Sequence, residues 1–126
     1  MIRSDNHVHT SFSTDSDTPM EQMVLKGIEL DLSSICFTDH IDYDFPDMGN
    51  GVEFLFDVDE YFAKLAALKE SYPQFELRRG VEIGLKPDLT ERCNALVHGY
   101  PFDFVIGSTH LVDNVDPYYP AFWEQY

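Results

Sequence analysis

The sequence predicts an α/β protein built from repeated βα units around a parallel sheet. Short apolar segments alternate along the chain with segments whose apolar residues recur at helical spacing. The expected order is strand, helix, strand, helix, strand, helix, strand, which is typical of parallel strands joined by crossover helices. Residues 34–38 contain an unbroken apolar run, as in strands that are buried on both faces. The 126 residues are enough for a single domain.

The first βα unit begins with a predicted strand at residues 2–8. A polar loop follows, and Thr18 then has the side chain of a helix N-cap. Pro19 suits the first helical position, and Glu21 is placed to complete a capping box with Thr18. Apolar residues at helical spacing predict one buried face, and we expect the helix to end near Leu30.

The second unit begins with the strand at residues 34–38. The following loop, residues 41–56, is long and rich in Asp, Gly, Pro and aromatic residues, a composition that favours a functional lid. Asp57 is expected to open the second helix, with Glu60 at the capping-box position, and Pro73 to close it.

The remaining elements are a strand at residues 75–83, a helix at residues 89–98 and a strand at residues 102–108. Gly99 and Pro101 are expected to stop this third helix. In parallel sheets, active sites form at the carboxyl ends of the strands. Side chains that can bind metal ions stand at or near the end of each predicted strand: His9, His40, Glu82 and His110.

The histidines near the start of the chain are the clearest pair. His7 and His9 are two residues apart on a predicted strand, so their side chains point to the same face. Asp15 follows just beyond the strand. Taken alone, the pair fits a metal site and two solvated histidines equally well, and the later strand ends favour the metal site.

The candidate ligands are imidazoles and carboxylates without a thiolate. Such a set suits Zn, Mn or Fe and disfavours a structural zinc site. Because Glu82 can bridge two ions, we expect a multinuclear hydrolytic site that activates water and neutralises a phosphoryl group. Asp39 and Thr38 could orient His40, or Asp39 could cap the following turn. His98 fits a histidine at a helix end.

The acidic composition of the chain excludes some classes of function. The chain has 8 basic and 23 acidic residues and a net charge of −15, which argues against a nucleic-acid surface. An anionic substrate would then need bound divalent cations to offset its charge. We expect no contact with a membrane, and the absence of a secretory leader predicts a cytoplasmic protein. Cys36 and Cys93 are interpreted as buried apolar residues.

Five ordered motifs resemble one known family, the PHP (polymerase and histidinol phosphatase) superfamily. They are His7-Val8-His9-Thr10, Ser13 with Asp15-Ser16, Phe37-Thr38-Asp39-His40, Gly80-Val81-Glu82-Ile83-Gly84 and the segment 102–110 that ends in Ser108-Thr109-His110. Asp116-Pro117-Tyr118-Tyr119 and Glu60-Tyr61-Phe62 resemble the histidinol-phosphate phosphatase branch.

The resemblance implies a distorted (β/α)7 barrel with a trinuclear centre of Zn, Mn or Fe ions. In this family pattern one ion is bound by His7, His9 and Glu82, a second by Glu82 and His110, and a third by Asp15 and His40. The implied reaction is hydrolysis of L-histidinol phosphate to L-histidinol and phosphate in histidine biosynthesis. A metal-bridging hydroxide attacks phosphorus, so that Glu82 and His110 act through it.

Family members are longer, so residues 1–126 would form a single PHP domain that is apparently truncated at its carboxyl end, the first half of the barrel. Alternatives therefore stay open: a PHP-type phosphoesterase with another substrate, or a catalytically incompetent module that binds metal. An open sheet edge in a half barrel would also allow self-association.

Overall fold

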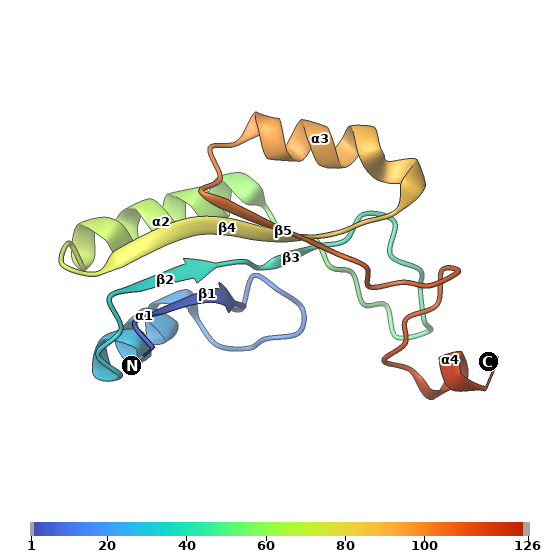
Figure 1. Cartoon of the computed structure of the whole chain (residues 1–126), viewed down its shortest axis with the longest axis horizontal. Helices are drawn as coiled ribbons and strands as arrows, with labels where there is room; N and C mark the ends of the chain where they lie inside the picture. The colour runs from blue at the N-terminus through green and yellow to red at the C-terminus, as the bar shows by residue number, and fades with distance from the viewer. Residues whose placement is uncertain (1, 125–126) are drawn as a thin grey trace.

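The computed structural model describes residues 2–124 and shows one curved sheet with helices packed on it (Figure 1). The elements in chain order are β1 (Ser4–Val8), α1 (Met20–Glu29), β2 (Ser34–Phe37), β3 (His40–Ile41), α2 (Val58–Ser71), β4 (Glu76–Gly84), a 3-10 turn (Pro87–Leu89), α3 (Thr90–Gly99), β5 (Phe104–Ser108) and α4 (Pro120–Trp123).

The long strand β4 lies at the centre of the sheet, and all strand pairings are parallel. One edge of β4 pairs first with β2 and then with β3, while its other edge pairs with β5. β1 pairs with the far side of β2. The predicted α/β fold with parallel strands is therefore confirmed, and the strand ends gather at one side of the sheet.

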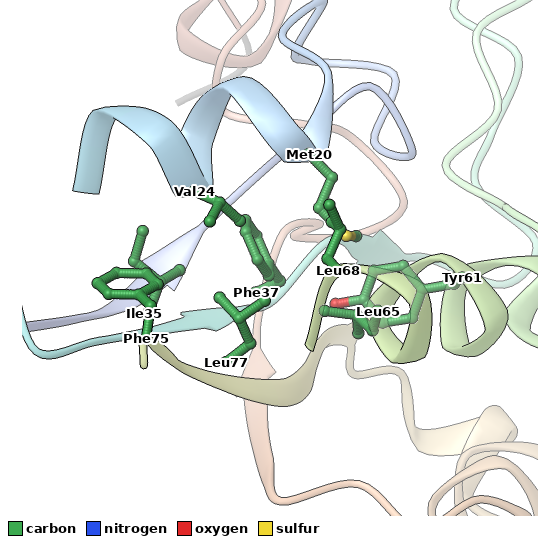
Figure 2. Packing of buried hydrophobic residues seen from close by; sticks show 9 residues of the cluster. All are labelled: Met20, Val24, Ile35, Phe37, Tyr61, Leu65, Leu68, Phe75 and Leu77. Atoms are coloured by element: carbon green, nitrogen blue, oxygen red, sulfur yellow. The ribbon is translucent and has the colours of Figure 1, made fainter. Parts of the chain in front are cut away.

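A hydrophobic cluster joins α1 and α2 to the sheet (Figure 2). It contains Met20, Val24, Ile35, Phe37, Tyr61, Leu65, Leu68, Phe75 and Leu77. Leu65 is fully buried, and removing such a side chain from water contributes about 1.5–3 kcal/mol. The cluster fixes both helices on the same face of β2 and β4.

A second hydrophobic cluster joins α3 to β3 and β4. Its buried members are Ile41, Val81, Ile83, Leu89, Cys93 and Leu96. Since side chains alternate along a strand, Glu82 between Val81 and Ile83 points to the opposite face. The helices α1, α2 and α3 therefore cover one face of the sheet, and the face that carries Glu82 stays available for a site.

Several local predictions need correction. The capping box of Thr18 and Glu21 does not form, because the residue at the N-cap is Pro19 and no side chain caps the helix. Glu21 instead accepts a hydrogen bond from the Tyr72 hydroxyl at 2.9 Å. The predicted cap of α2 is confirmed, since the Asp57 carboxylate accepts from the Glu60 amide at 2.9 Å.

Element boundaries also differ from the pattern. β1 begins at Ser4 and β5 at Phe104, two residues later than predicted in each case. The two-residue strand β3 and the short helix α4 were not predicted. Across residues 2–124, the helices are too short or too polar to span a bilayer.

Candidate metal centre

Six side chains singled out from the sequence lie together at the carboxyl ends of the strands. β1 supplies His7, and His9 and Asp15 follow it; β3 supplies His40, β4 supplies Glu82, and His110 comes two residues after β5. The register of the parallel strands explains the convergence. Glu82 on β4 pairs with His40 on β3 along one edge and with Ile106 on β5 along the other.

The carboxylate of Glu82 lies at the middle of this group, and the residue as a whole is 4% exposed. Its Oε2 atom is 2.8 Å from Nε2 of His7 and 2.9 Å from Nε2 of His9. Its Oε1 atom is 2.9 Å from Nε2 of His110. Nε2 of His40 lies slightly farther away, 3.5 Å from Oε2. The two oxygens thus face different donors, as a carboxylate does when it bridges two cations.

Asp15 extends the group beyond β1. Its Oδ2 atom is 2.9 Å from Nδ1 of His9 and 3.4 Å from Nε2 of His40. His9 therefore has a carboxylate at each ring nitrogen, Asp15 at one and Glu82 at the other. The loop after β1 brings Asp15 between two strand ends that are distant in sequence.

The structure adds Asp42, which the sequence analysis missed. Its buried carboxylate lies 3.2 Å from Nδ1 of His40 and 2.8 Å from Nδ1 of His110. Asp42 follows His40 by two residues and comes directly after β3, so continued strand alternation places both on one face. That spacing was the available signal, but the long polar loop concealed it.

Asp39 has a different role from either of the two considered. Its fully buried carboxylate accepts hydrogen bonds from the amide and hydroxyl of Thr10 and from the amide of Ser13. Burial raises the pKa of Asp39, and these hydrogen bonds oppose that rise. The Ser13 hydroxyl in turn accepts from the backbone amide of His40 at 2.7 Å. Asp39 therefore anchors the loop that holds the backbone of His40.

Electrostatic interactions within the group are strong. The hydrogen bond to Glu82 raises the pKa of His9 to about 9, against the opposing effect of burial. Hydrogen bonds to Asp42 and then to Glu82 raise the pKa of His110 to about 10. Burial by itself would raise the pKa of Glu82. Hydrogen bonds from the histidines outweigh this effect and hold the pKa of Glu82 well below its usual range. The carboxylates therefore favour positive charge in the site.

The donors form three overlapping groups that could each hold a metal ion. They are His7, His9 and Glu82; His9, Asp15 and His40; and His40, Asp42 and His110. Within each group the ligand atoms lie within 4.8 Å of one another. A mixed set of imidazole nitrogens and carboxylate oxygens suits divalent transition metals, so the residues fit such ions.

Other residues considered in the sequence lie apart from this group. His98 lies in the last turn of α3, as expected. Cys36 and Cys93 are buried and unpaired with each other, and burial raises the pKa of the Cys36 thiol to about 11. Neither thiol belongs to the groups of metal-ligating side chains found among the described residues.

A cavity of about 680 Å³ opens beside the metal-ligand group. Asp15, His40 and His110 lie on its wall, together with the aromatic side chains of Phe45 and Phe54. Its volume is in the range of small-molecule sites. A second cavity of about 720 Å³ contains none of the six predicted site residues, so the smaller one is the candidate site.

Comparison with known proteins supports a family assignment. The PHP domain family matches residues 5–126. A probable histidinol-phosphatase from Clostridium acetobutylicum is 38% identical over 114 residues, which cover 90% of this chain and 42% of the relative. A histidinol-phosphatase from Lactococcus lactis subsp. lactis is 32% identical over 119 residues, 94% of this chain and 43% of the relative.

The fold comparison agrees with the sequence comparison. A crystal structure of histidinol phosphate phosphatase from Lactococcus lactis, complexed with Zn, L-histidinol and phosphate, superimposes with a TM-score of 0.84 at 31% identity. The match covers 90% of this chain and 42% of that chain, so this chain spans less than half the length of its relatives. On its sequence motifs, fold and site geometry, the chain belongs to the PHP domain family.

Proposed function

We propose that this chain provides the metal-binding part of a phosphomonoesterase that hydrolyses L-histidinol phosphate to L-histidinol and phosphate. The observation that carries the proposal is the convergence of four imidazoles on Glu82 beside a cavity of small-molecule size. Divalent cations bound there would supply Lewis-acid stabilisation of a phosphoryl group and activation of water.

We assign the ligands to three positions, each for one Zn, Mn or Fe ion. His7, His9 and Glu82 would bind one ion, Glu82 and His110 a second, and Asp15 and His40 a third. The short distances from Glu82 to three Nε2 atoms support a bridging role for its carboxylate. Glu82 and His110 would then be nearest the reacting phosphoryl group.

Asp42 would orient two of these ligands, His40 and His110. By accepting Nδ1–H hydrogen bonds from His40 and His110, it would hold the tautomer in which each Nε2 lone pair points into the site. A histidine that ligates a metal through one ring nitrogen usually donates a hydrogen bond from the other ring nitrogen.

The charge of the substrate also favours metal dependence. No Lys or Arg is found among the described residues that line the cavity, and the carboxylates of Asp15, Asp42 and Asp116 in that lining would repel a phosphate group. Bound cations would reverse this local charge. L-Histidinol phosphate is the favoured substrate because the relative from Lactococcus lactis is complexed with L-histidinol and phosphate.

The test is to reconstitute the protein with Zn²⁺, Mn²⁺ or Fe²⁺ and measure bound metal and phosphate release. We expect L-histidinol phosphate to be hydrolysed in preference to other phosphomonoesters, and Glu82→Gln to lose both metal and activity. Glu76→Gln, an exposed position on the same strand, is the control that should keep both. A protein that retains no metal and releases no phosphate would contradict the proposal.

The second candidate is a unit that binds metal without turnover. It is favoured because the aligned region covers only 42% of the length of the relative from Clostridium acetobutylicum. It predicts bound metal, no phosphate release from any ester, and self-association in size-exclusion chromatography. An active monomer would remove this candidate.

A further inference from the structure

The cavity beside the metal-ligand group is lined by two chemically different sets of side chains. One set is the histidines and carboxylates of that group. The other set, here named the aromatic wall, consists of aromatic residues and includes Phe45 and Tyr119. A hydrogen bond of 3.0 Å from the Asn50 side-chain amide to the Tyr119 hydroxyl ties the loop after β3 to the segment after β5. The aromatic wall is thus assembled from two distant parts of the sequence.

Asp116 lines the same cavity and differs from the other carboxylates there. Asp15 and Asp42 each contact histidines of the metal-ligand group, whereas Asp116 belongs to none of the three ligand groups. Its Oδ1 atom accepts a hydrogen bond of 2.8 Å from the Tyr118 amide, which fixes the side chain. A carboxylate can accept about four hydrogen bonds, so it retains capacity for a ligand.

The arrangement therefore combines a fixed negative charge with aromatic rings, next to a site for a phosphoryl group. No Lys or Arg lies among the described residues that line this cavity, so neither of these side chains occupies the Asp116 carboxylate there. A primary ammonium group matches Asp116, and a flat ring matches the aromatic wall.

We propose that Asp116 is a specificity residue that binds the ammonium group of an amino-alcohol phosphate whose ring packs against Phe45 and Tyr119. The inference rests on the proposed function, since that function places the phosphoryl group at the metal-ligand group. It assigns the other half of the substrate, which the metal ligands do not recognise, to the segments 42–54 and 110–119.

The test measures binding of product analogues to the Zn-loaded protein by isothermal titration calorimetry. The probes are L-histidinol, the same imidazole alcohol without its amine, and L-alaninol, which keeps the amine but lacks the ring. Wild type should bind L-histidinol on the order of tenfold more tightly than the analogue without the amine, the gain expected of a charge-assisted hydrogen bond.

Asp116→Asn should abolish this preference for the amine, because the substitution removes the charge while the amide oxygen can still accept from Tyr118. Phe45→Leu should weaken the binding of L-histidinol and leave the binding of L-alaninol unchanged. Asp88→Asn, at an exposed position on the 3-10 turn, controls for the loss of one charge and should behave as wild type.

The inference is overturned if wild type does not distinguish the two imidazole alcohols, or if Asp116→Asn keeps the distinction. Its failure is separable from failure of the proposed function. Phosphate release from L-histidinol phosphate with no amine preference refutes the role of Asp116 alone. An amine preference that Asp116→Asn removes, in a protein that hydrolyses no phosphomonoester, refutes the proposed reaction and upholds the binding site.

Discussion

The side chain of Asp42 occupies the space that a Cβ atom on Gly84 would require. A methyl group there would overlap the Oδ1 and Cγ atoms of Asp42. Because the same carboxylate contacts His40 and His110, the absence of a side chain at the end of β4 is a condition for the geometry of the site.

Gly84→Ala should therefore displace Asp42 and loosen both histidines. We expect a loss of about 1–3 kcal/mol in the free energy of unfolding from overpacking, and a loss of about 10–100-fold in metal affinity. Urea denaturation and a chelator competition assay measure the two effects. Gly99→Ala is the control, since a Cβ there meets no atom within 4 Å. Unchanged metal affinity in Gly84→Ala would show that Asp42 does not depend on this space.

Asp42→Asn should weaken metal binding by about 10–100-fold, because an amide can present its NH₂ group to one of the imidazoles and disturb the tautomers. The affinity is measured by competition with a chromogenic chelator at neutral pH. Asp44→Asn is a matched control two residues away, where the carboxylate pairs with Arg92 on the surface. Equal affinities for the two variants would contradict the role of Asp42.

Leu65→Ala should lower the free energy of unfolding by about 2–5 kcal/mol, because Leu65 is fully buried between α2 and the sheet. Leu25→Ala removes the same atoms from a side chain on α1 that is 48% exposed, and should change the free energy by less than about 0.5 kcal/mol. Urea denaturation compares the two variants. Similar losses would mean that the cluster in Figure 2 does not contribute more to stability than the exposed face of α1.

The ion pair of Asp103 and Arg79 should make stability depend on pH in the acid range. The hydrogen bond from Arg79 lowers the pKa of Asp103 to about 2. A carboxyl group with a lowered pKa in the folded state stabilises the fold above its ordinary pKa of about 3.9, and this contribution is lost as pH falls through the folded value. The stabilising window therefore closes between about pH 4 and pH 2.

Asp103→Asn should be less stable than wild type at about pH 5, by no more than about 1 kcal/mol for a pair at the surface. The difference should shrink towards about pH 2, as measured by urea denaturation across that range. Asp59→Asn serves as a control for the removal of one exposed carboxylate. A difference that grows on acidification would contradict a stabilising role for the ionised Asp103 carboxylate.

The sequence was sufficient for the order of the longer strands and helices and for the six convergent side chains. Buried strands and amphipathic helices leave periodic patterns, and the parallel order then places strand ends together whatever the details of the loops. His7 and His9 could be paired from alternation alone. The convergence of His40, Glu82 and His110 required the topology as well.

What could not be predicted depends on contacts between segments far apart in the sequence. β3 has two residues, too few for a periodic pattern, and it exists because it pairs with β4. The spacing of Asp42 from His40 indicates a shared face, but the contact of Asp42 with His110 could not be predicted from it. Glu21 matched a capping motif, yet its carboxylate contacts Tyr72 from another helix end, so a tertiary contact replaced the local one.

In the proposed assignment the carboxylate of Glu82 is shared by two of the three ion positions, since its two oxygens face different imidazoles. Filling one position would therefore orient a donor of its neighbour, so that successive ions load cooperatively instead of independently. A Zn²⁺ titration at protein concentrations below the dissociation constants should then be sigmoidal, and Glu82→Ala should empty two positions at once, whereas His7→Ala should empty one.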